Sequence, residues 1–187
     1  MMDSAHRSND SDPGIAPPRC FVTVGATAGF RQLLEEVGEP SFLATLARLG
    51  FDSMDVQCGP DLAWFQAKLA SLHDSEKHGV EVSAFDLTDN MQKYMVACRG
   101  ERGVRLPGCI ISHAGRTLTT REVMRISATN LEASGTGTIL EAMRYAAPLV
   151  VVPNPTLMNN HQAELAEECE KQKWAVYGRL GCVISHK

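Results

Sequence analysis

The sequence has 187 residues, a formal net charge of −4, 44% hydrophobic residues and 21% charged residues. This length allows one domain with a substantial core, and the composition is that of an ordinary globular protein. The acidic balance argues against a general nucleic-acid binder, because no basic stripe is present to neutralise phosphates.

The cysteines are scattered and form no CxxC pair; they are Cys20, Cys58, Cys98, Cys109, Cys169 and Cys182. Several lie in apolar runs, where a cysteine acts as a small hydrophobic residue. The pattern favours neither a disulfide framework nor a zinc site and predicts a reducing, cytosolic environment. No apolar run reaches the roughly 18 residues of a membrane span, and no signal peptide opens the chain. We therefore expect membrane association only through a partner.

The first 19 residues are polar and proline-rich, and we expect a disordered tail there that ends at Pro17 and Pro18. Residues 20–24 (CFVTV) then predict a strand, residues 25–30 (GATAGF) a glycine loop, and residues 30–37 a helix. Loops at the carboxyl ends of parallel strands line the binding crevice of such folds. The loop alone is compatible with a ligand contact or with a plain tight turn.

The middle of the chain alternates between helix and strand patterns. The predicted helices cover residues 40–49 with Gly50 as the cap, 61–72 with Asp61 as the cap, and 86–97; the predicted strands cover residues 51–58, 80–85 and 106–112. We interpret Trp64 and Phe65 as core residues, with an aromatic platform for a ligand as the alternative. His73 and His78 are expected to be solvated.

The last third resumes the alternation, with a helix predicted from Gly137 to Tyr145 and a buried parallel strand at 148–152. A helix over residues 159–173, with Asn159 or Asn160 as the N-cap, and a short strand at 174–177 complete the pattern. Alternating strands and helices predict an α/β fold, a Rossmann-like parallel sheet with flanking helices.

A glycine–threonine turn before the helix at 137 has the composition of a phosphate site, since glycines let backbone N–H groups converge at a helix N-terminus. Glu141 follows one turn later, where a carboxylate would repel phosphate unless it had another function. Accepting hydrogen bonds from ribose hydroxyls is one such function. A surface Glu favoured by the helix dipole is an equal alternative on spacing alone.

Several motifs together resemble the donor-sugar half of GT-B glycosyltransferases: HAG at 113–115, TGTILEA at 136–142, PLVVVP at 148–153 and NNHQAELA at 159–166. More narrowly, they are similar to the family of catalytic subunits of the dolichol-linked UDP-N-acetylglucosamine transferase. FVTVGAT near the start and WAVYGRLG near the end fit the same family. The resemblance covers roughly residues 20–181 and predicts one UDP-sugar-binding domain over residues 20–187.

The resemblance implies a split enzyme that transfers GlcNAc from UDP-GlcNAc to GlcNAc-diphosphodolichol, the second step of lipid-linked oligosaccharide synthesis for protein N-glycosylation. A membrane-anchored partner subunit would bind the lipid-linked GlcNAc acceptor and hold this chain at the cytosolic face of the endoplasmic reticulum, with a further cytosolic pool. No cofactor and no metal are expected, and UDP-GlcNAc is the donor substrate.

The same resemblance assigns the site residues. It places Gly137 and Thr138 at the diphosphate, Glu141 at the ribose, and Asn160, His161 and Gln162 at the sugar hydroxyls; His113 and Gly115 end the strand beneath the reacting centre, and Gly25 and Thr27 face it from the first loop. The family inverts the anomeric centre by direct displacement. His113 is the candidate base, with a structural histidine or a base on the partner as alternatives.

The chain departs from the family pattern between HAG and the glycine–threonine turn, where residues 116–135 intervene. Removing these twenty residues restores the unbroken motif, so a frame-preserving retained intron is one hypothesis and a surface excursion, with a short helix at 119–125, is the other. The family also has a C-terminal helical segment that helps to dock the partner, whereas only residues 181–187 remain here. Both departures give the alternative function: a non-catalytic nucleotide-sugar-binding or scaffold protein.

Overall fold

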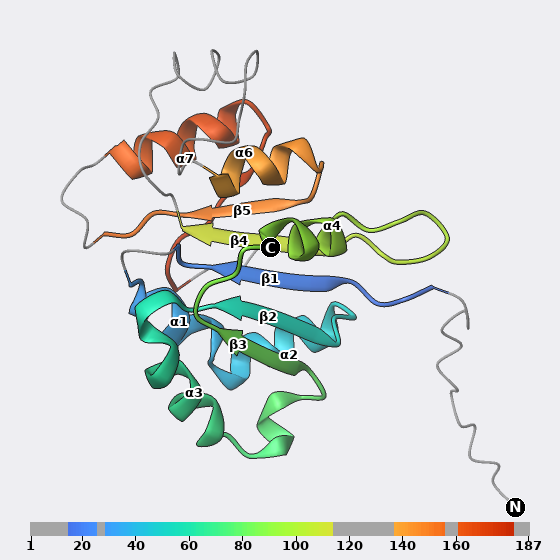
Figure 1. Cartoon of the computed structure of the whole chain (residues 1–187), viewed down its shortest axis with the longest axis vertical. Coiled ribbons are helices and arrows are strands. Elements are labelled where there is room, and N and C mark those ends of the chain that lie inside the picture. The colour runs from blue at the N-terminus through green and yellow to red at the C-terminus, as the bar shows by residue number, and fades with distance from the viewer. Residues whose placement is uncertain (1–14, 26–28, 114–136, 156–160, 182–187) are drawn as a thin grey trace, which may run out of the picture.

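The computed structural model describes residues 15–25, 29–113, 137–155 and 161–181. Within these ranges the chain forms one parallel sheet whose strands run in the order β3-β2-β1-β4-β5-β6 (Figure 1). The strands are β1 (Arg19–Thr23), β2 (Ser53–Gln57), β3 (Glu81–Phe85), β4 (Cys109–His113), β5 (Leu149–Val152) and β6 (Val176–Tyr177). The helices are α1 (Arg31–Val37), α2 (Pro40–Arg48), α3 (Leu62–Ala70), α4 (Met91–Arg99), α6 (Gly137–Arg144) and α7 (His161–Lys171), with 3₁₀ turns η1 (Gly59–Asp61) and η2 (Asp74–Lys77).

The strand order contains one reversal, the point at which open α/β sheets generally bind their ligands. From β1 the chain adds β2 and then β3 on one side, and it then returns to place β4 on the other side of β1. The carboxyl ends of β1 and β4 therefore meet at the topological switch point, where the following loops diverge and leave a crevice. The predicted α/β class and parallel sheet are confirmed.

Alternation along the strands divides the core between the two faces of the sheet. In β1, Cys20 and Val22 belong to the cluster that includes the buried residues of α1, α2 and α3, whereas Phe21 belongs to the cluster that includes buried residues of α4, α6 and α7. The ring of Phe21 stacks on Phe85 and Tyr94, with centroids 6.5 and 5.1 Å away. Both faces of β1 are buried, as expected for a central parallel strand covered by helices on each side.

One helix start and one capping bond differ from the sequence prediction. The helix predicted from residue 86 begins instead at Met91, because the side chain of Asn90 accepts the backbone N–H of Lys93 at 3.1 Å and fixes the first turn there. Asp61 does precede α3, but its side chain makes no capping bond and binds the guanidinium of Arg31 at 2.8 Å. The same guanidinium lies 5.0 Å from the ring of Trp64.

The end of α2 has the predicted glycine, although Leu49 rather than Gly50 is the capping residue. Gly50 has φ +86°, and its N–H donates to Ala47 O while Phe51 N–H donates to Leu46 O. These two bonds form a Schellman motif, which requires a left-handed residue at this position. A Cβ added to Gly50 would have no neighbour within 4 Å, so only backbone conformation restricts this site.

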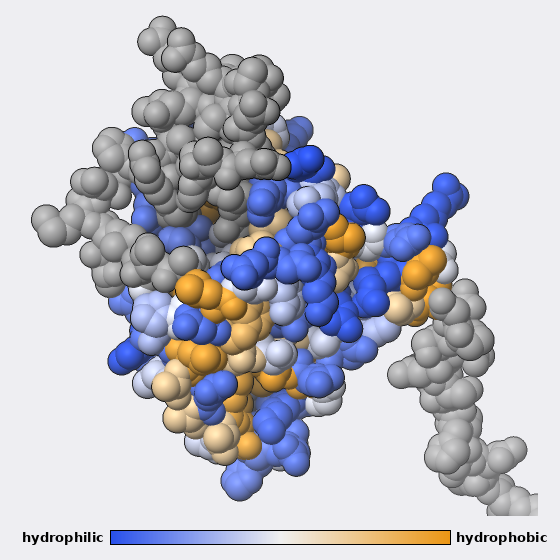
Figure 2. All heavy atoms as spheres, in the orientation of Figure 1, coloured by the Kyte–Doolittle hydropathy of each residue, from blue (hydrophilic) through white to orange (hydrophobic). Residues whose placement is uncertain are grey.

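The surface carries both hydrophilic and apolar regions. Figure 2 shows hydrophilic residues over much of the face seen in Figure 1 and apolar residues gathered over its lower part, where β3 and α3 lie. Leu87, which follows β3, is 57% exposed. His73 and His78 are exposed, as predicted. Among the described helices, none is long and apolar enough to cross a membrane.

Candidate functional site

The loop after β1 is fixed by a buried polar pair. Thr23 donates from Oγ1 to Gln57 Oε1 at 2.6 Å, and its Oγ1 accepts the N–H of Gly25 at 3.3 Å. Both side chains are buried and have no water to bind, so these hydrogen bonds satisfy their polar groups. The β1 and β2 carboxyl ends are thereby joined, and Gly25 leaves the sheet in a defined direction with φ +83°.

His113 ends β4 and lies directly against Gly25. A Cβ on Gly25 would lie 2.7 Å from His113 Cε1 and 3.3 Å from Nδ1, so the imidazole edge occupies the space that any other residue at position 25 would need. The ring of Phe30 meets the imidazole edge-to-face, with centroids 6.5 Å apart. The structure therefore brings together two predicted site residues that are far apart in sequence.

Burial determines the charge of this histidine. Loss of hydration lowers the pKa of His113 below its usual value, because the charged imidazolium is the form that burial disfavours. The neutral ring is therefore the resting form near pH 7. A neutral imidazole at the end of a strand, beside a glycine loop, is able to accept a proton from a hydroxyl group.

A second buried polar group lies two residues beyond β5. Asn154 donates its backbone N–H to Gln162 Oε1 at 2.9 Å and its side-chain Nδ2 to the carbonyl of Gly29 at 3.4 Å. Asn154 is 2% exposed and Gln162 is 8% exposed. Gln162, which the resemblance assigned to the sugar, therefore has its carboxamide oxygen engaged by the protein, and its contact with sugar stays a prediction.

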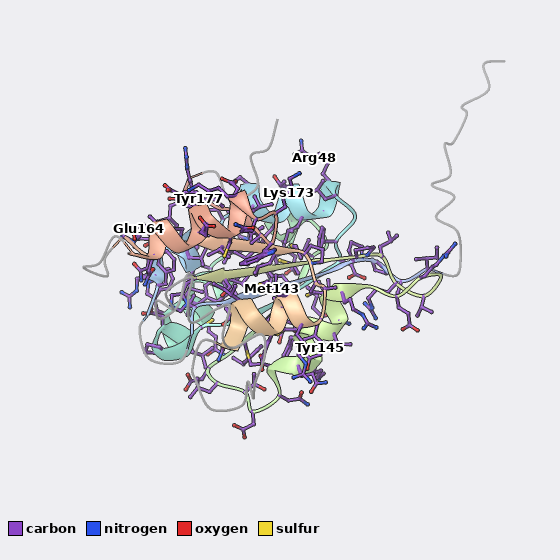
Figure 3. The ribbon with its side chains drawn as sticks, turned by 90° about the horizontal axis from the view of Figure 1, so that it is seen from above. Arg48, Met143, Tyr145, Glu164, Lys173 and Tyr177 are labelled. Atoms are coloured by element: carbon purple, nitrogen blue, oxygen red, sulfur yellow. The ribbon has the colours of Figure 1, made fainter. Side chains whose placement is uncertain are left out.

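The N-termini of α6 and α7 face the same edge of the sheet. Figure 3 shows Glu164 near the start of α7, Met143 near the end of α6 and Tyr145 just after it. Both helices run away from the edge where the strands end. Gly137 begins α6, and Glu141 lies half-buried one turn later. Each N-terminus is the positive end of its helix dipole, so this edge of the sheet favours an anionic group.

The remaining predicted site residues and segments lie partly or wholly outside the described residues. Thr27, Gly115 and Asn160 are outside the described residues, as are the insert at 116–135 and residues 1–14 of the predicted tail at 1–19. The last five residues of that tail are ordered instead, because Ala16 N–H donates to Val104 O at 2.6 Å and Arg19 begins β1. The backbones of Thr138 and His161 belong to α6 and α7. The assigned roles of all these residues stay predictions.

Sequence reasoning missed three buried polar residues that shape this edge: Thr23, Gln57 and Asn154. Each had a recognisable signal, since each is a hydrogen-bonding side chain at or just after the carboxyl end of a predicted strand. Asn154 also lies between Pro153 and Pro155. A polar side chain at such a position is buried only if it is hydrogen-bonded, so it indicates a network near the site.

Among the described residues, neither a metal-ligand cluster nor a disulfide is present. Within these residues, no group of three or more His, Cys, Asp or Glu side chains is placed to hold a metal ion. The five cysteines that the structure describes are free thiols. Burial raises the pKa of Cys58 to about 12, so this thiol stays protonated and unreactive.

Comparison with known proteins identifies the family of this chain. The sequence model of the glycosyltransferase family 28 C-terminal domain matches residues 133–185. The UDP-N-acetylglucosamine transferase subunit ALG13 of Kluyveromyces lactis is 30% identical over 166 residues, which cover 84% of this chain and 78% of that protein. The Candida glabrata protein of the same name is 30% identical, with 79% and 73% covered. The Yarrowia lipolytica protein is 31% identical, and the match spans 61% of its length.

The fold has a solved counterpart. The NMR solution structure of ALG13 aligns with a TM-score of 0.56 and 21% identity, covering 88% of this chain and 79% of that chain. This likeness supports the fold, whereas the sequence matches carry the family assignment. The chain belongs to the family of UDP-N-acetylglucosamine transferase subunits named ALG13.

Proposed function

We propose that this chain is the donor-binding subunit of an inverting N-acetylglucosaminyltransferase. It would transfer GlcNAc from UDP-GlcNAc to GlcNAc-diphosphodolichol, the second step of the lipid-linked oligosaccharide pathway that serves N-glycosylation. The observation that carries the proposal is the contact of Gly25 with His113 at the switch point, in a chain about 30% identical to named transferase subunits over most of its length.

The proposed donor spans the carboxyl edge of β1, β4 and β5. The diphosphate would lie at the start of α6, at Gly137 and Thr138, with the ribose on Glu141. The sugar would lie toward Asn160, His161 and Gln162 at the start of α7. This order follows the strand order and keeps the anion beside a helix N-terminus, where backbone N–H groups stabilise it.

The chemical step needs three contributions. The acceptor hydroxyl attacks the anomeric carbon, the bond to the UDP oxygen breaks, and the hydroxyl proton goes to a base. Helix N-termini and backbone N–H groups stabilise the charge that develops on the departing UDP, so the proposal requires no metal and no cofactor. His113 is the proposed base, because its lowered pKa keeps it neutral and its ring lies at the carboxyl end of β4, against Gly25.

The acceptor half belongs to another polypeptide in this proposal. The relatives are named as subunits, which supports a complex with a second chain. We propose a membrane-anchored partner that binds the lipid-linked acceptor and recruits this chain to the cytosolic face of the endoplasmic reticulum.

Calorimetry of UDP-GlcNAc binding tests the donor site. Replacing Glu141 with Gln or Ala is expected to weaken binding by about 2–3 kcal/mol, roughly 30- to 150-fold in Kd, because hydrogen bonds from ribose to a charged acceptor are lost. The exposed Glu167 on α7 gives a matched control, Glu167→Ala, which is expected to bind normally. Unchanged affinity of Glu141→Ala would remove Glu141 from the site.

A transfer assay with the membrane partner and a lipid-linked acceptor tests the activity. Run with and without residues 116–135, it separates the transferase from the alternative. Turnover by the full chain supports the proposal. In the other outcome, the full chain binds the donor without turnover, and turnover is gained when residues 116–135 are removed. That result would show that the chain containing these residues is the non-catalytic form.

A further inference from the structure

The loop after β5 reaches across a neighbouring strand. β5 pairs with β4, and β4 pairs with β1, so β1 and β5 are separated by a full strand. Asn154 nevertheless bonds through Nδ2 to the carbonyl of Gly29, in the loop that follows β1 and 125 residues earlier in sequence. The bond therefore passes over the carboxyl end of β4, where His113 lies.

The same residue also fixes the start of α7. Its backbone N–H donates to Gln162 Oε1, so one buried asparagine joins the loops after β1 and β5 to the first turn of α7. The flanking Pro153 and Pro155 restrict the backbone on both sides, which reduces the freedom of the loop to move away. Gly29 in turn precedes Phe30, whose ring contacts His113.

We propose that Asn154 is a positioning residue for donor binding: it holds the first loop against the start of α7, so that Gly25, His113 and the α7 residues contact a single ligand. This inference rests on the proposed function for the identity of the ligand. Its structural part, the effect of Asn154 on the packing of the loop against His113, does not depend on any ligand.

The chemistry requires an amide rather than any polar group of this size. The Gly29 carbonyl accepts a hydrogen bond, and an ionised carboxylate has no hydrogen to donate. Asn154→Asp therefore keeps the shape of the side chain but places a buried negative charge against that carbonyl. Asn154→Ala removes the side-chain amide and with it the bond to the Gly29 carbonyl. Both variants keep the backbone N–H that binds Gln162, so their effects report on the side-chain amide of Asn154.

The test uses the full chain and three variants: Asn154→Ala, Asn154→Asp and Asn90→Ala. Asn90 is the matched control, because it is an asparagine whose side chain makes a structural bond, at the start of α4. UDP-GlcNAc affinity is measured by calorimetry well below the unfolding temperature of each variant. The titration of the His113 imidazole is followed by NMR without ligand.

We expect Asn154→Ala to weaken UDP-GlcNAc binding by about tenfold, the effect of one hydrogen bond at the upper end of its usual range, and Asn154→Asp at least as much. The midpoint of His113 should rise in both, because a loosened loop admits water to the ring whose pKa burial now lowers. Asn90→Ala should lose stability and change neither readout.

The outcomes distinguish the two proposals. If the wild-type chain binds UDP-GlcNAc while both Asn154 variants bind equally well with an unchanged His113 midpoint, Asn154 is only structural and the inference is wrong. If the wild-type chain binds no UDP-GlcNAc, the proposed function fails, and the His113 midpoints still decide whether Asn154 positions the loop.

Discussion

Replacing Gly25 with Ala isolates the contact on which the candidate site depends. The left-handed backbone at Gly25 costs about 1–2 kcal/mol for any residue with a side chain. The added methyl group would also lie 2.7 Å from His113 Cε1, so the ring must move, and such overpacking costs about 1–3 kcal/mol more. We expect Gly25→Ala to lower the free energy of unfolding by about 2–5 kcal/mol.

Gly50→Ala is the matched control. Gly50 has φ +86°, close to the +83° of Gly25, but a Cβ there has no neighbour within 4 Å. Both variants gain the same small stabilisation from restricting the unfolded chain, and that effect cancels in the difference. The difference between the two variants therefore measures the cost of displacing His113.

Urea unfolding followed by tryptophan fluorescence gives the two free energies, and NMR gives the titration of His113. We expect Gly25→Ala to be the less stable variant, by about 1–3 kcal/mol, and to shift the His113 resonances. Equal losses in the two variants, with an unchanged His113 titration, would refute the contact and with it the geometry of the site.

Two further predictions concern the buried polar groups. Thr23→Val should lower the free energy of unfolding by about 1–3 kcal/mol, since it leaves the buried carboxamide of Gln57 without its donor. Thr45→Val should cost much less, because the hydroxyl of Thr45 donates to the carbonyl of Ser41 at an exposed position, where water can replace it. Because burial lowers the pKa of His113 in the folded chain, the unfolded chain binds more protons between that value and about 6.5. Stability should therefore rise with pH through this window and level off above it, and His113→Gln should flatten the rise; an identical slope in wild type and variant would contradict the burial of His113.

Local sequence patterns were sufficient for the fold. Alternation in the first strand, the helical spacing of Phe42, Leu43 and Leu46, and the apolar run at β5 each predicted an element that the structure contains. The errors were at element boundaries, where a single side chain can determine the residue at which a helix begins. Asn90 moved the start of α4 by five residues, because a capping bond outweighs the weak helical preference of the residues before it.

The candidate site was only partly predictable. The residue types at Gly25 and His113 were visible in their motifs, but their contact depends on β4 pairing with β1, which no local pattern specifies. Asn154 was missed for the same reason, since its partner Gly29 lies 125 residues away. Side-chain networks between loops depend on the strand order, and this becomes known only with the whole fold.

The central claim is that UDP-GlcNAc binds at the carboxyl edge of β1, β4 and β5. Titration of the ¹⁵N-labelled full chain with UDP-GlcNAc, followed residue by residue, tests it most directly. We predict saturable changes at Gly25, Gly29, His113 and Gln162, and none at residues 101–108, in the loop that precedes β4 at the opposite edge. Absence of saturable changes, or changes confined to residues 101–108, would contradict the account.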